Sequence, residues 1–357
     1  MRKQLILLAG LHKTGTTTVQ RTCGKKSQLF KELGILYPLE IQGITPWTGQ
    51  RGAANHSYLL RMLFKENPPI SVSSRDGNAV LLKKLQDRAR ELFEGFLEQQ
   101  ALPRLLMVAE AVSTLSASEL ADLKHWFCLR GFDIRLLCCI RSPLSWLNSI
   151  VDQRVAGVHG PHLTIRAVIE EFEVMSGIIR PHISNLASVF PDAEFYSFKS
   201  AASHAGGPAG YFFDKVGLNI KLELSSIRAN RGRSRHFVRI WTLINEEERP
   251  PDWMEKGYLN FLASARHVLS AVRGQKFRLR LDELGSLASI LVEENEWLKR
   301  QFGEEFCDEK MDMSNDLPPL DNDTRARLEA IAAATDPRVR QAIHRYLLNY
   351  GQSCTLR

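Results

Sequence analysis

The sequence has 357 residues, a formal net charge of +7 at pH 7, and 44% hydrophobic and 24% charged residues. These proportions are ordinary for a globular protein that buries a core, and no transmembrane segment is expected because no stretch approaches the ~20 apolar residues that span a membrane. The positive charge allows acidic partners such as nucleotides, nucleic acid or anionic glycans, but it is spread along the chain, which argues against a nucleic-acid-binding face.

A short apolar strand at the start of the chain leads into a loop and then into a helix that begins near Thr16. Gly10 and Gly15 keep the spacing of the phosphate-binding pattern G-x-x-x-x-G-K-[ST], and Thr17 occupies its last position. The lysine of the pattern is displaced, because Thr16 follows the second glycine and the lysine stands earlier, at Lys13. Backbone N–H groups and the positive end of the helix dipole meet here, as they do at phosphate and sulfate sites. We therefore predict an anion site rather than a turn capped by threonines.

Further apolar runs alternate with helical patterns along the chain. Strands are predicted over residues 4–9, 34–37, 104–109, 133–140 and 193–198, and helices over 78–100, 116–129, from 143, and over 163–189. From residue 236 onward the pattern is mostly helical. Strands that alternate with helices indicate an α/β fold with right-handed crossovers. We predict a P-loop-like parallel sheet of four to five strands flanked by helices, with a mostly helical C-terminal third.

Charged residues gather where the predicted strands end. The third strand ends at Glu110 and the fourth at Arg141, and ligands of such sheets bind beyond the carboxyl ends of the strands. A Walker-type NTPase needs a carboxylate there to hold Mg²⁺, whereas Arg141 would repel a metal and attract a second phosphate. Glu110 could imitate that carboxylate, but it has no second acid beside it. These positions predict a nucleotide with phosphates at two places and no metal.

Two motifs resemble those of a known family. "HKTGTTTVQ" resembles the 5′-phosphosulfate loop of sulfotransferases that use 3′-phosphoadenosine 5′-phosphosulfate (PAPS). "IRSPLSWLNSIVDQRV" is similar to their 3′-phosphate motif, in which an arginine is followed eight residues later by a serine, here Arg141 and Ser149. The segment "VAEAVSTLS" and the W-L-x-S helix are most similar to the bacterial carbohydrate-type branch. The resemblance is firm over residues 4–24 and 104–156 and looser elsewhere.

The resemblance implies PAPS as co-substrate and a set of residues that bind it. That set is His12, Lys13, Thr14, Gly15, Thr16, Thr17, Thr18, Arg141 and Ser149. It also implies a catalytic role for Lys13, which would stabilise the charge that grows on the leaving 5′-phosphate. Metal neutralisation matters less here, because a sulfuryl group in transit carries less negative charge than a phosphoryl group.

The acceptor hydroxyl needs a base, and related sulfotransferases place a histidine or glutamate at the end of a central strand. Glu110 stands at that place, so it is our candidate base; a capping or salt-bridged role is the alternative. His12 is the rival base. His56 could line the acceptor site, although a lone histidine before an apolar helix is usually structural. Arg231, within the arginine-rich segment 227–237, could contact the 3′-phosphate or an acidic acceptor, but a solvated charge run is the commoner explanation for such a segment.

The sequence thus predicts an enzyme, a PAPS-dependent sulfotransferase that modifies a hydroxyl of a saccharide or glycolipid. Its expected partner is a small-molecule or glycan acceptor, with no nucleic acid. The alternatives are a P-loop kinase or NTPase with a degenerate Walker A loop, and a non-enzymatic nucleotide- or RNA-binding protein. Residues 1–235 are expected to form the PAPS-binding core, with 41–77 as an acceptor-side insertion. Residues 236–357 are expected to form a helical extension packed on that core, so that the chain is one domain overall.

Cysteine usage favours a reducing compartment. The six cysteines form no C-x-x-C pair, and Cys138 and Cys139 lie in an apolar run where they are expected to pack as small hydrophobic residues. The N-terminus imitates a secretory signal, but its apolar run ends at His12, where such a signal continues toward a cleavage site. We therefore expect a cytoplasmic protein.

Overall fold

The computed structural model divides the chain into two compact units. It describes residues 3–41, 44, 48–49, 53–66, 79–157, 163–175, 177–218, 220, 232–247, 256–308, 315 and 320–353. The first unit comprises Met1–Ser142, Ile179–Ala229 and Glu296–Cys307, and the second Pro143–Ile178, Asn230–Asn295 and Asp308–Arg357. Pro143–Ile178 thus groups with the C-terminal helices, whereas the expected boundary lies at residue 235. That expected boundary stays a prediction.

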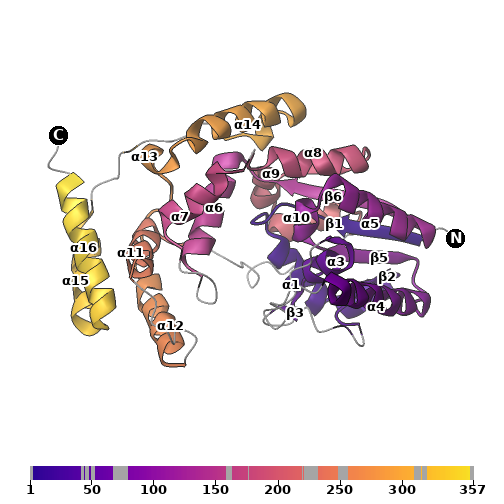
Figure 1. The fold of residues 1–357 in the computed structure, drawn as a ribbon, viewed down its shortest axis with the longest axis horizontal. Coiled ribbons are helices and arrows are strands. Elements are labelled where there is room, and N and C mark those ends of the chain that lie inside the picture. The colour runs from indigo at the N-terminus through magenta and orange to yellow at the C-terminus, as the bar shows by residue number, and fades with distance from the viewer. Residues whose placement is uncertain are drawn as a thin grey trace. The chain divides into compact units, whose positions relative to one another are not determined.

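The first unit is built on a five-stranded parallel sheet with the strand order β2-β5-β1-β6-β7 (Figure 1). The strands are β1 (Lys3–Leu8), β2 (Ile35–Leu36), β5 (Arg104–Val108), β6 (Phe132–Ile140) and β7 (Glu194–Ser197). The side chains of Leu5 to Leu8 are at most 1% exposed, as expected for a central parallel strand covered on both faces. The prediction of a P-loop-like parallel sheet flanked by helices is confirmed.

The central position of β1 creates a switch in the topology of the sheet. β5 and β2 occupy one side of β1, and β6 and β7 occupy the other. In register, Leu5 of β1 faces Leu105 of β5 on one side and Ile134 of β6 on the other. Ligands of open α/β sheets bind at such a switch point, outside the carboxyl ends of the strands. The loop that follows β1 lies at that place.

Helices surround the sheet of the first unit. They are α1 (Thr16–Lys25), α2 (Ser27–Glu32), α3 (Ser57–Phe64), α4 (Ala79–Glu98), α5 (Ala117–Leu129), α8 (Arg180–Val189), α9 (Phe198–Ser203) and α10 (Gly207–Lys215), with the 3₁₀ turns η2 (Glu110–Thr114) and η4 (Glu304–Phe306). A short hairpin joins β3 (Thr48–Gly49) and β4 (Ala53–Ala54). The predicted start of α5 is confirmed, because Ser116 and Glu119 form a capping box there.

The described part of the second unit is helical, as predicted for the C-terminal third. It contains α6 (Pro143–Val155), α7 (Ile165–Glu173), α11 (Arg235–Asn245), α12 (Lys256–Ser270), α13 (Leu281–Leu284), α15 (Asn322–Ala334) and α16 (Pro337–Ser353), and α14 (Leu287–Phe302) passes from it into the first unit. Trp241 of α11 is fully buried, and its ring stacks on Phe237 at 5.3 Å. None of the helices described in either unit is long and apolar enough to cross a membrane.

The prediction of one helix over residues 163–189 is wrong. The chain forms α7 and α8 instead, and α8 begins with a proline, Pro181, in its first turn. Proline has no N–H to donate to a preceding turn and clashes with its carbonyl groups. A helix that arrives from Glu173 therefore does not continue through this position.

Candidate active site

Close packing around the loop after β1 favours glycine at both of its glycine positions. A Cβ atom on Gly10 would lie 3.2 Å from the backbone nitrogen of Cys139, at the end of β6. Gly15 has a φ of 84°, and a Cβ there would lie 2.7 Å from Pro208 of α10. Only glycine fits such a left-handed position without strain. The glycine spacing seen in the sequence is thus explained by contacts with two other elements.

The threonines of the loop divide into two pairs. Thr14 and Thr16 are buried, and the Thr14 hydroxyl donates to the Leu11 carbonyl at 2.5 Å, so it is used inside the loop. Thr17 and Thr18 are half-buried at the start of α1. The first N–H groups of a helix have no partner in the helix itself, and Gly15 at the N-cap has no side chain to satisfy them. The loop therefore presents backbone donors suited to an anion.

Lys13 and Arg141, the two cations predicted to face phosphates, are brought together. Arg141 donates from Nη1 to the backbone carbonyl of Lys13 at 3.1 Å, and its guanidinium lies over the ring of Phe198, 5.0 Å from the centroid. Lys13 has a φ of 67°, and no other non-glycine residue among those described has a positive φ. A lysine in this conformation costs about 1 kcal/mol relative to the right-handed one. The loop is held in a strained shape beside a fixed arginine.

Glu110 begins the 3₁₀ turn η2, which Ala109 separates from the end of β5, and its side chain is only 14% exposed. Its carboxylate accepts hydrogen bonds from Gln20 Nε2 of α1 at 3.0 Å and from Asn55 Nδ2 at 3.3 Å. Asn55 is itself fixed, because its carbonyl oxygen accepts from the backbone N–H of Ser57 at 2.9 Å. Two separate segments, α1 and the residues just before α3, thus hold the candidate base in one orientation at the carboxyl edge of the sheet.

His12 lies next to Glu110. Its Nδ1 is 4.0 Å from Glu110 Oε1, and 41% of its side chain is exposed. Burial lowers the pKa of His12, the neighbouring Glu110 carboxylate partly offsets this, and the positive charges of Arg61 and Lys13 lower it further. The neutral imidazole is therefore favoured near pH 7, and both candidate bases stand together at the loop.

His56 has a structural role. It is fully buried, its Nδ1 accepts from the Val108 backbone N–H at 3.0 Å, and its Nε2 donates to the Pro38 carbonyl at 2.8 Å. Burial lowers the pKa of His56 to about 4, so the ring is neutral and satisfies backbone groups of β5 that the short β2 leaves unpaired.

Other predicted residues are not tested by the structure. Ser149 lies in α6 of the second unit, so its pairing with Arg141 stays a prediction. Arg231 lies outside the described residues, as does much of the predicted insertion 41–77.

Several residues near the site were missed by the sequence reasoning. They are Gln20, Asn55, Arg61, His182 and Phe198. Gln20 had a weak signal, because it is a polar residue next to Val19 on the buried face of α1, and a buried amide needs a partner. The others depend on contacts between distant segments.

Comparisons with known proteins give no family assignment. No protein-family model matches the chain, and no curated protein matches it significantly. Among solved structures, the "Sulfotransferase Domain from the Curacin Biosynthetic Pathway" aligns with 65% of this chain and 79% of its own, at 11% identity and a TM-score of 0.34. The "Sulfotransferase Domain from the Synechococcus PCC 7002 Olefin Synthase" aligns with 82% of this chain and 96% of its own, at 8% identity and a TM-score of 0.34. Likeness at this level assigns no function to the chain.

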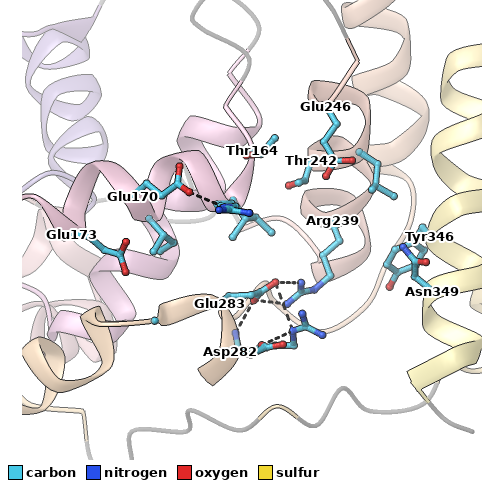
Figure 2. Close-up of a pocket in the computed structure, with 16 residues that line it drawn as sticks. Thr164, Glu170, Glu173, Arg239, Thr242, Glu246, Asp282, Glu283, Tyr346 and Asn349 are labelled. Carbon is cyan, nitrogen blue, oxygen red and sulfur yellow. Dashed lines mark hydrogen bonds and ion pairs between the residues drawn. The ribbon is translucent and has the colours of Figure 1, made fainter. Parts of the chain in front are cut away.

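The second unit contains a cavity of about 800 Å³ between α7, α11, α13 and α16 (Figure 2). Several of its charged side chains pair with one another. Glu283 pairs with Arg239, with a distance of 3.0 Å from Arg239 Nη2 to Glu283 Oε2, and Arg280 Nε is 3.1 Å from Asp282 Oδ1. Glu170 likewise accepts from its helix neighbour Arg166 at 2.7 Å. None of the predicted site residues lines this cavity.

Proposed function

We propose that the protein is a PAPS-dependent sulfotransferase, which transfers a sulfuryl group to a hydroxyl of a saccharide or glycolipid acceptor. The observation that carries the proposal is the hydrogen bond from Arg141 to the Lys13 carbonyl. It joins the ends of β1 and β6, and it brings two cationic residues to the N-terminus of α1, where anions bind. The two resemblances to PAPS motifs, read from the sequence, fall on these same residues.

The displaced lysine suits sulfuryl transfer. In the proposed reaction the acceptor oxygen bonds to sulfur while the bond from sulfur to the 5′-phosphate oxygen breaks. Lys13 stabilises the negative charge that the leaving adenosine 3′,5′-bisphosphate gains. His12, Gly15, Thr16, Thr17, Thr18 and the backbone of Thr14 hold the phosphosulfate, and Arg141 with Ser149 holds the 3′-phosphate through charge-assisted hydrogen bonds.

Glu110 is the proposed general base, and it receives the proton that the acceptor hydroxyl loses. Its two amide donors fix the carboxylate without neutralising it. His12, which is within 4.0 Å of the same carboxylate, is the second candidate for that proton. We also propose a cytoplasmic location for the protein, as expected from its cysteine usage.

Calorimetry tests the proposal without an acceptor. Adenosine 3′,5′-bisphosphate should bind in the absence of Mg²⁺, and ATP should bind at least tenfold more weakly with or without it. Tighter, Mg²⁺-dependent binding of ATP would overturn the proposal in favour of a kinase or NTPase. Mass spectrometry of any nucleotide that co-purifies with the protein gives an independent identification.

A further inference from the structure

Arg61 of α3 is a half-buried arginine that has no charged partner among the residues that the structure describes. Within that part of the chain its buried Nε has no hydrogen-bond partner, and no carboxylate pairs with its guanidinium. Nearby arginines behave differently. On α4, Arg90 pairs with Asp122 and donates to the Leu63 carbonyl at 2.9 Å, and Arg88 pairs with Glu91 at 2.9 Å. An unpaired, partly buried charge is unfavourable, so the exception requires an explanation.

The position of Arg61 on its helix directs it toward the candidate site. Residues four apart share a face of a helix, and Ser57, one turn before Arg61, accepts from the backbone N–H of Ala111 at 3.1 Å. Ala111 is the neighbour of Glu110 in η2. The charge of Arg61 also lowers the pKa of His12, which places the guanidinium within electrostatic reach of that candidate base.

Further positive or neutral groups surround the same turn. His182 of α8 hydrogen-bonds to the backbone of Ser113 in η2, and the charge of Lys65 lowers the pKa of His182. Lys65 follows Arg61 by four residues at the end of α3 and makes no ion pair with the described residues. Glu110 is already bonded to two amides, and its carboxylate lies 4.0 Å from His12. The surroundings of the proposed base are therefore suited to a negatively charged ligand.

We infer that Arg61 recognises an anionic group on the acceptor, a carboxylate or a phosphate close to the hydroxyl that is modified. This inference rests on the proposed function. The phosphosulfate and the 3′-phosphate are assigned to Lys13, the start of α1 and Arg141, so the anion that Arg61 contacts belongs to the other substrate. The planar guanidinium offers a fork of donors that matches the oxygens of a carboxylate or phosphate. The substrate class is thus an acidic saccharide rather than a neutral one.

The test uses the full chain saturated with adenosine 3′,5′-bisphosphate, with binding of three sugars measured by calorimetry or NMR titration. Glucuronate and glucose 6-phosphate present the two kinds of anion, and glucose is the neutral counterpart. We expect wild-type protein to prefer at least one acidic sugar to glucose by about tenfold or more, and Arg61→Ala to remove that preference. Arg88→Ala changes the net charge by the same amount at an exposed ion pair, and this variant should keep the preference for acidic sugars.

Each other outcome overturns the inference. Equal binding of all three sugars to the wild type excludes anion recognition, and unchanged preference in Arg61→Ala excludes this residue. A tenfold or greater loss of bisphosphate affinity in Arg61→Ala would assign Arg61 to the nucleotide instead. If the wild type does not bind adenosine 3′,5′-bisphosphate at all, the proposed function is refuted, and the inference about Arg61 is refuted with it. Arg61→Gln, which keeps the length of the side chain, replaces the alanine variant if the latter does not fold.

Discussion

Replacing Arg141 with alanine is expected to weaken binding of adenosine 3′,5′-bisphosphate much more than binding of adenosine 5′-monophosphate, which lacks the 3′-phosphate. A charge-assisted hydrogen bond contributes about 1.5–3 kcal/mol, or roughly ten- to hundredfold in affinity. The upper part of this range applies, because the Lys13 carbonyl and the Phe198 ring already hold the guanidinium in place. Little side-chain entropy is then lost on binding.

The same substitution also removes the donor to the Lys13 carbonyl. A hydrogen bond of this kind contributes about 1 kcal/mol. Its loss loosens the loop, so the affinity for both nucleotides should fall by up to about fivefold. The difference between the two losses isolates the contact to the 3′-phosphate.

Isothermal titration calorimetry of both nucleotides measures this difference. The matched control is Arg135→Ala on β6, the strand that ends just before Arg141. The guanidinium of Arg135 pairs with Glu194 at 2.6 Å and donates to the Lys215 carbonyl at 2.8 Å. This control variant should bind both nucleotides like the wild type. Equal losses for the two nucleotides in Arg141→Ala would refute the reasoning, because Arg141 would then act only through the loop.

Three further predictions follow from the same geometry. Lys13→Ala should lower kcat of sulfuryl transfer more than the affinity for adenosine 3′,5′-bisphosphate, because its contact strengthens as the leaving group gains charge; an equal loss in both would contradict this role. Glu110→Gln should reduce turnover by ~10²–10⁴-fold. It should lower the unfolding free energy by only about 1 kcal/mol, because one of the two amide side chains that donate to Glu110 can rotate and present its carbonyl oxygen to the new NH₂ group. Near-normal turnover of this variant, in an assay across a panel of acidic saccharides, would identify His12 as the base instead. Because the pKa of His56 is about 4 in the folded protein and about 6.5 when unfolded, its contribution to stability is complete above pH 6.5 and is lost as the pH falls toward 4; urea unfolding midpoints should show this slope in the wild type and a shallower one in His56→Ala.

The sequence predicts those parts of the structure that depend on local patterns. Continuous apolar runs identify the buried strands, and the spacing of Gly10 and Gly15 identifies the loop, because both features lie within short segments. The charged residues at the strand ends follow once a parallel sheet is assumed. Cys138 and Cys139 are buried among apolar side chains, as their surroundings predict.

Contacts between distant segments could not be predicted from the sequence. The hydrogen bond from Gln20 to Glu110 joins residues 90 positions apart, and that from Asn55 to Glu110 joins residues 55 apart. Their pairing depends on the strand order, which brings β5 beside β1. The role of His56 was foreseen only as a general tendency, because its partners Pro38 and Val108 become neighbours through the same sheet.

The left-handed backbone of Lys13 has a consequence for anyone who selects variants of this protein for heat resistance. Glycine adopts that conformation freely, so Lys13→Gly would relieve about 1 kcal/mol of strain and rank among the favourable substitutions in a screen for a higher Tm. The same substitution removes the ammonium group from the loop. A selection on stability alone would therefore discard the residue to which we assign the stabilisation of the leaving group, and a library built for both stability and activity should keep Lys13 fixed.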